Sequence, residues 1–104
     1  RFVKMENLEI LVVDDLEENR ETAKEYFESI GLTVDLAIDY ESGKEKLEQK
    51  DYYAAILDLQ LPNKEGEFGE YGFELEKIAN GLHKLNVIDK ARFARRVAGK
   101  TKPE

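Results

Sequence analysis

The sequence contains no cysteine and no tryptophan, and it has one histidine and two prolines. The absence of cysteine excludes a disulfide framework and any metal site built on thiolates. Because histidine is also nearly absent, a zinc site is not expected. A chain without cysteine fits a reducing compartment, and we expect a cytoplasmic protein.

Long apolar runs and an excess of basic charge are also absent. No run is long enough to cross a bilayer, and no apolar leader precedes a cleavage site, so we expect no membrane partner. The net charge of -7 argues against nucleic acid as the main partner, because a nucleic-acid backbone attracts basic surfaces. The 104 residues, of which 41% are hydrophobic, suffice for one domain with a modest core.

Charge is unevenly distributed along the chain. Residues 1–82 have a net charge of -12, and residues 83–104 have a net charge of +5. The basic segment is either the solvated face of a helix or a docking segment for an acidic surface, including that of this chain itself. We predict a single domain over residues 5–104 with an atypical basic segment at 86–104, and we interpret residues 1–4, which precede Met5, as an expression remnant.

Three short apolar runs predict buried strands, at Leu8–Val13, Thr33–Ile38 and Tyr53–Leu57. The segment after the first run has apolar residues at i, i+3, i+4 and i+7, which predicts a helix that ends before a glycine; these residues are Ala23, Tyr26, Phe27 and Ile30, followed by Gly31. Residues 40–50 predict a weaker second helix. Helices that alternate with buried strands indicate an α/β fold with a parallel sheet and helices on both faces.

The second half of the chain is less regular. Residues 63–72 predict a loop; its glycines are Gly66, Gly69 and Gly72, but its glutamates exclude a phosphate-binding loop. A third helix is predicted from the spacing of its apolar residues, which are Leu75, Ile78, Ala79, Leu82 and Leu85. Residues 86–89 predict a very short strand, and residues 91–98 a last helix.

Three aspartates follow the predicted strands directly. Asp14 and Asp15 end the first strand, and Asp58 ends the third. If these strands are neighbours in a parallel sheet, the acids converge at the carboxyl edge, where ligands bind in such folds. Carboxylates in one pocket favour Mg²⁺ or Mn²⁺, and Asp58 could then act as a nucleophile toward phosphorus. Taken singly, Asp14 could instead cap a helix and Asp58 could be a turn residue. An acidic pair after the first strand together with an Asp after the third is less readily explained by chance.

The sequence resembles the receiver domains of response regulators over roughly residues 8–72. The resemblance is carried by "ILVVDD", "ENRETAKEYFESIGLTVDLAID" and "YAAILDLQLPNKEG". It implies a flavodoxin-like (CheY-like) three-layer, doubly wound parallel sheet, and phosphoryl transfer to Asp58 from a histidine kinase or phosphotransfer protein. It further implies that Mg²⁺ is held by Asp14, Asp15, Asp58 and the main-chain carbonyl of Gln60. Leu61–Pro62 and Gly66 match the Met-Pro pair and the glycine that follows it in the family.

The C-terminal half departs from the family pattern. Receivers have a Ser or Thr that ends strand four, yet after Asp58 the only aliphatic hydroxyl is Thr101. Lys102–Pro103 offers the family's Lys-Pro pair, but at the chain end, where a solvated tail is the alternative. We therefore expect strands four and five to be shortened or missing. We expect an open edge at strand three and, through it, a possible homodimer.

Three functions follow from these observations. The first is a signalling domain of a two-component phosphorelay that accepts a phosphoryl group on Asp58, which is a binding module with at most weak autophosphatase activity. The second is a pseudo-receiver that works by dimerisation or partner binding without phosphate. A metal-dependent phosphohydrolase is disfavoured, because Gln60 stands where a second Asp would serve as acid or base. His83, the single histidine, is a solvated surface residue, or else a phosphoryl acceptor or metal ligand.

Overall fold

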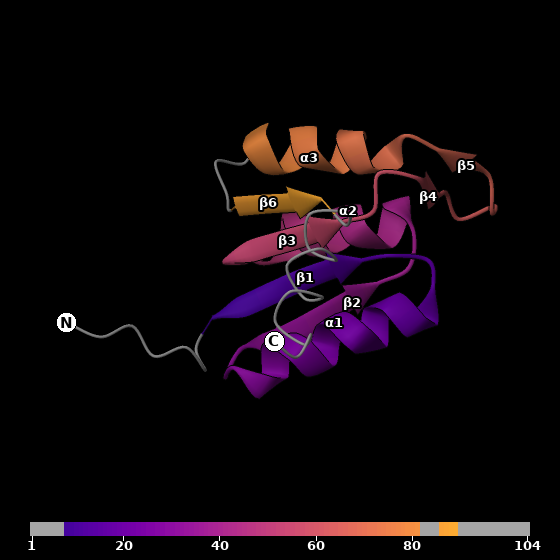
Figure 1. Cartoon of the computed structure of the whole chain (residues 1–104). Helices are drawn as coiled ribbons and strands as arrows, with labels where there is room; N and C mark the ends of the chain where they lie inside the picture. Colours follow the sequence, from indigo (N-terminus) through magenta and orange to yellow (C-terminus); the bar gives the residue numbers. More distant parts are fainter. Residues whose placement is uncertain (1–7, 82–85, 90–104) are drawn as a thin grey trace.

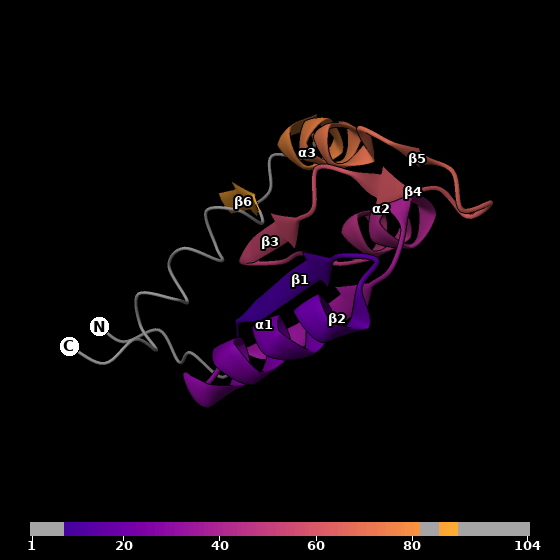
Figure 2. The same ribbon diagram turned by 45° about the vertical axis from the view of Figure 1, so that its right-hand side comes forward.

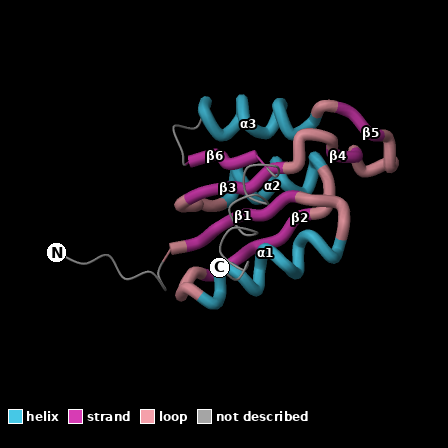
Figure 3. Tube along the Cα trace, in the orientation of Figure 1, coloured by secondary structure: helices cyan, strands magenta, loops and turns pink. Residues whose placement is uncertain are grey.

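The structure is a computed structural model that describes residues 8–81 and the backbone of residues 86–89. Strands and helices alternate through most of it (Figures 1 and 3). The strands are β1 (Glu9–Val13), β2 (Thr33–Ala37), β3 (Ala54–Leu57), β4 (Leu61–Pro62), β5 (Phe68–Gly69) and β6 (Asn86–Asp89). The helices are α1 (Glu17–Ser29), α2 (Tyr40–Gln49) and α3 (Tyr71–Gly81).

The main sheet has four strands in the order β2-β1-β3-β6, and every neighbouring pair is parallel. Helix α1 covers one face, and α2 and α3 cover the other (Figures 1 and 2). This is the predicted three-layer arrangement. It places the carboxyl ends of β1 and β3 side by side, since Val13 pairs with Leu57.

The two faces of the sheet account for the continuous apolar runs. Successive residues of a strand point to opposite faces, so a strand covered on both sides must be apolar throughout. Leu11 and Val13 lie in the core under α2 and α3, whereas Ile10 and Val12 lie in the core under α1. All four side chains are at most 2% exposed.

The three helices predicted within the described residues are present, with small differences at their ends. Gly31, at a positive φ of 93°, follows the end of α1, but Ile30 is 47% exposed because it lies at the cap and not on the buried face. Asp39 caps α2: its carboxylate accepts a hydrogen bond from the Ser42 amide, and Ser42 in turn accepts one from the Asp39 amide. This capping box makes the start of α2 definite despite its weak apolar pattern.

The prediction that residues 63–72 form a loop is wrong in part. β4 and β5 pair antiparallel as a small hairpin, and the last two residues of the range already belong to α3. Asn63 organises the hairpin: its Oδ1 accepts hydrogen bonds from the amides of Glu65 and Glu67, at 3.0 and 2.9 Å. Gly66 turns the chain at φ 86°, in a region that favours glycine. Strands of two residues leave no periodic signal in a sequence.

The predicted open edge at strand three is also wrong. β6 forms the very short strand expected at residues 86–89 and pairs with β3 along its whole length, from Ala54–Asn86 to Leu57–Asp89. Other predictions for the C-terminal half lie outside the described residues; they concern Leu82, His83, Leu85, the helix at 91–98, Thr101 and Lys102. Among the described helices, none is long and apolar enough to span a membrane.

Candidate functional site

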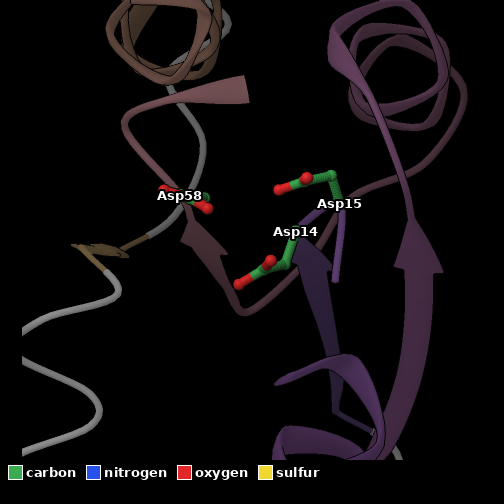
Figure 4. Close-up of side chains that lie close together, drawn as sticks. All are labelled: Asp14, Asp15 and Asp58. Carbon is green, nitrogen blue, oxygen red and sulfur yellow. The ribbon is translucent and has the colours of Figure 1, made fainter. Parts of the chain in front are cut away.

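The three predicted aspartates converge at the carboxyl edge of the sheet. Asp14 and Asp15 follow β1, Asp58 follows β3, and one carboxylate oxygen from each lies within 4.8 Å of the other two (Figure 4). The cause is topological. β1 and β3 are parallel neighbours, so residues 44 positions apart in the sequence, such as Asp14 and Asp58, lie at the same edge.

Asp14 is the buried member of this cluster, with 3% of its surface exposed. Its Oδ1 accepts a hydrogen bond from the Leu16 amide at 3.0 Å, and its Oδ2 accepts one from the Asn19 side-chain amide at 3.2 Å. The Arg20 guanidinium donates to its main-chain carbonyl at 2.8 Å. The residue that caps α1 is Leu16, so Asp14 braces the start of the helix without being its cap.

Asp15 and Asp58 are partly exposed and face the same opening. The Asp58 amide donates to the Val13 carbonyl at 3.0 Å, which continues the β1–β3 pairing past the end of the strand. Its Oδ1 accepts a hydrogen bond from the Gln60 amide at 3.2 Å. The side chain is therefore oriented by its own loop and still accessible from solution.

Glycine has a direct structural role beside Asp58. A Cβ atom at Gly72 would lie 2.2 Å from the Asp58 carbonyl oxygen and 2.6 Å from the Leu59 Cα, so no side chain fits there. The Gly72 amide also donates to the Leu59 carbonyl at 3.2 Å. Gly66, which we matched to the family glycine, has open space around it. The glycine that shapes the site is thus Gly72.

Sequence reasoning missed three residues of the site's surroundings: Asn19, Arg20 and Gly72. Asn19 and Arg20 are polar residues in the first turns of α1, and they lie outside the apolar pattern from which we predicted this helix. The position of Gly72 directly before the helical pattern that starts at Leu75 was the available signal for a close approach. The roles predicted for His83 and Lys102 fall on residues outside the described part of the chain.

The donor set fits a small divalent cation. It consists of carboxylate oxygens alone, and their spacing within 4.8 Å lets one ion contact all three. The main chain of Gln60 lies next to Asp58, as its amide contact shows, so a carbonyl ligand from this residue is compatible with the loop. Hard oxygen ligands of this kind suit Mg²⁺.

Comparison with known proteins gives a consistent result. The family model for the response regulator receiver domain matches residues 10–88. Among solved structures, the response regulator TrrA of Thermotoga maritima, in complex with Mg²⁺ and BeF, is 30% identical with a TM-score of 0.64. That match covers 77% of this chain and 65% of TrrA. No curated protein matches the chain.

Two further receiver structures are similar. The HemR receiver domain of Leptospira biflexa is 27% identical with a TM-score of 0.61, over 88% of this chain and 73% of that one. The receiver domain of the Francisella response regulator 1452 is 21% identical with a TM-score of 0.63, over 80% and 66%, and this likeness concerns the fold alone. The chain thus spans about two thirds of the length of these structures, and by the family match it belongs to the response regulator receiver domains.

Proposed function

We propose that this receiver domain is a Mg²⁺-dependent phosphoacceptor in two-component signalling, with Asp58 as the acceptor. The convergence of Asp14, Asp15 and Asp58 within 4.8 Å carries the proposal. Three carboxylates at one edge repel one another, and an arrangement of this kind is favourable when a cation binds between them. Asp58 is the acid at the end of the central strand β3, oriented by the Gln60 amide.

In the transfer step, a carboxylate oxygen of Asp58 attacks the phosphorus atom of the donor. A bond forms between this oxygen and phosphorus, and the bond between phosphorus and the donor breaks, with the electron pair leaving on the donor. Asp14, Asp15, Asp58 and the Gln60 carbonyl would hold the metal ion. When bound, Mg²⁺ supplies positive charge that stabilises the transferring group.

Asp14 and Asp15 have different roles in the proposed metal site. Asp14 is buried, and both of its carboxylate oxygens already accept hydrogen bonds, so it fixes the loop and the electrostatic field of the site. Asp15 is partly exposed, so its carboxylate would be the more accessible of the two to the ion. The Mg²⁺ complex of TrrA supports the choice of metal, and this support does not extend to Mn²⁺.

The partner that we propose is a histidine kinase or phosphotransfer protein, which is the usual partner of receiver domains. The domain itself acts as a switch, not as an enzyme, apart from slow loss of its own phosphoryl group. A cytoplasmic location agrees with this partner. Lys102, whose place is not described, is the candidate for the basic residue that receivers direct toward the phosphoryl group.

A pseudo-receiver that acts without phosphate is the second candidate, and one observation favours it. β6 ends on Asp89, which pairs with Leu57, the residue before Asp58. Receivers carry a hydroxyl residue at the end of this strand, and the sequence has no Ser or Thr between Asp58 and Asp89. Such a module would act through protein contacts. A homodimer would then form beyond β6, the last strand of the described sheet, because β3 is already paired.

The intact mass after incubation with acetyl phosphate and Mg²⁺ distinguishes these candidates. We expect one phosphoryl adduct on the parent and on Asp51→Ala, a control that removes an exposed acid away from the site. Asp58→Ala, or omission of Mg²⁺, should abolish the adduct. If circular dichroism shows a folded parent that never gains the adduct, the phosphoacceptor proposal is wrong and the pseudo-receiver takes its place.

A further inference from the structure

The hairpin that follows Asp58 presents an unusual surface. Phe68 is 62% exposed in β5, and the glutamates around it are also exposed. These glutamates are Glu65, Glu67 and Glu70. Phe73, in the first turn of α3, adds a second aromatic side chain that is 43% exposed. We call residues 64–74 the hairpin face. Figures 1 and 2 show that the hairpin projects beyond the carboxyl edge of the sheet.

The hairpin face is held in place by hydrogen bonds. The Asn63 amide donates to the Glu67 carbonyl at 2.8 Å, and the Gly66 amide donates to the Asn63 carbonyl at 2.9 Å. The side chain of Asn63 adds bonds to Glu67 Oε1 and to the Tyr71 hydroxyl, at 3.2 and 3.4 Å. An aromatic side chain kept exposed on an ordered hairpin is a common feature of binding surfaces.

The negative charge of the hairpin face favours the binding of a basic segment. Residues 64–74 carry four acidic residues and one basic residue. Residues 90–104, in contrast, carry 6 basic residues and a single acidic one. This segment also contains Phe93 and Val97, which could meet the exposed aromatic side chains. Charge and apolar character are thus complementary between the two parts of the chain.

The described backbone ends, at β6, on the same edge of the sheet from which the hairpin leaves. β6 is parallel to β3 and ends at Asp89, opposite Leu57, so residue 90 starts at the edge from which the hairpin leaves. Leu61, the first residue of β4, is only four positions beyond Leu57. Fifteen extended residues reach roughly 50 Å. A short tether of this kind gives an effective concentration on the order of millimolar, so even weak attraction would be effective.

We propose that residues 90–104 bind the hairpin face of their own chain through their basic side chains and Phe93. This contact does not depend on phosphorylation, so it goes beyond the function proposed above.

The test uses amide NMR spectra of the full unphosphorylated chain and of two variants. The first variant, Arg92→Gln/Arg95→Gln/Arg96→Gln, removes charge from the segment. The second, Glu65→Gln/Glu70→Gln with Phe68→Ser, alters the hairpin face at exposed positions and leaves Asn63 and Glu67 intact. The matched control is Glu25→Gln/Glu28→Gln, which removes two exposed charges from α1.

We expect the arginine variant to shift the amides of residues 64–74, and the hairpin variant to shift those of residues 90–104. High salt should produce the same shifts in the parent, because it screens the attraction. A water-soluble carbodiimide should link lysines of the segment to Glu65 or Glu70 within one chain, and the control should behave like the parent. Shifts that stay local to each substitution would overturn the proposal. So would shifts or cross-links that depend on protein concentration, because these indicate binding to a second copy.

Discussion

Two clusters of acidic side chains in this domain differ in the groups that donate hydrogen bonds to them. Where α2 leads into β3, Lys50 Nζ lies 2.9 Å from both Glu9 Oε2 and Asp35 Oδ2, and the Tyr52 hydroxyl donates to Asp35 at 2.7 Å. We call these four residues the Lys50 network. At the carboxyl edge, the hydrogen bonds described for the carboxylates of Asp14 and Asp58 come from main-chain amides and the side chain of Asn19, which are neutral; the Arg20 guanidinium donates to the main-chain carbonyl of Asp14.

The acids of the Lys50 network stabilise the fold, whereas those at the carboxyl edge are suited to binding a ligand. In the Lys50 network the fold supplies the compensating charge, and the carboxylates tie β1 and β2 to the segment before β3. At the carboxyl edge, neutral donors orient the carboxylates of Asp14 and Asp58. Carboxylates that are oriented in this way suit a cation site. A change at the carboxyl edge should leave the Lys50 network unaffected, and the reverse should also hold, so each region serves as a control for the other.

The largest effect is expected at Gly72. Gly72→Ala places a Cβ 2.2 Å from the Asp58 carbonyl oxygen, and the contact is with backbone, so the chain beside the acceptor must move. We expect a loss of about 3 kcal/mol in the free energy of unfolding, as for severe overpacking, measured by urea denaturation. The matched control is Gly81→Ala, which has open space at the end of α3 and should be nearly neutral. Equal effects of the two substitutions would mean that the approach at Gly72 is not tight.

Mg²⁺ should raise the free energy of unfolding of the domain by binding at the carboxyl edge, independently of the Lys50 network. At a Mg²⁺ concentration of 100 times Kd, the parent should gain about 2.7 kcal/mol in the free energy of unfolding. Asp15→Asn should lose most of this gain and be slightly more stable than the parent without metal, because one repulsive charge is gone. Asp35→Asn, in the Lys50 network, should keep the full gain. Urea denaturation with Mg²⁺ and with EDTA measures each value. A parent that Mg²⁺ does not stabilise would refute the metal site.

Much of the fold and the core of the site could be predicted from the sequence. Short apolar runs covered on both faces can be recognised without a structure, and a parallel sheet brings their ends together. The convergence of Asp14, Asp15 and Asp58 follows from that topology alone. The predicted short strand at residues 86–89 was also confirmed as β6.

The features that were missed depend on contacts between distant residues. The hairpin has strands of two residues, which have no period, and the pairing of β6 with β3 involves only four residues. Gly66 turns a hairpin and Gly72 packs against Asp58, and only the position of Gly72 before the helical pattern distinguishes the two in the sequence. The Lys50 network likewise joins three segments through side chains whose neighbours only the tertiary structure defines.

Tyr52 is expected to give a smaller, pH-dependent effect. The pKa of Asp35 is lowered mainly by the hydrogen bond from Tyr52 and then by Lys50, which together outweigh burial. A lowered pKa in the folded state adds stability above the unfolded pKa of about 3.9, and this stability is lost as the pH falls through the folded pKa. The Tyr52 side chain is only 5% exposed. Burial raises the pKa of Tyr52, and its hydrogen bond to Asp35 raises this pKa further.

Tyr52→Phe should therefore cost about 1 kcal/mol at pH 7, a modest value because solvent reaches Asp35 and screens the bond. The cost should shrink as the pH falls from about 4 through the lowered pKa of Asp35, since Asp35 is protonated in both proteins only below that folded-state pKa. Urea denaturation at several pH values measures this difference, with Tyr53→Phe as the control, because Tyr53 is 52% exposed. A cost that stays constant across the pH range would show that the Tyr52 hydroxyl acts independently of the Asp35 charge. Mg²⁺ should stabilise Tyr52→Phe as much as the parent, because the Lys50 network and the carboxyl edge are separate sites.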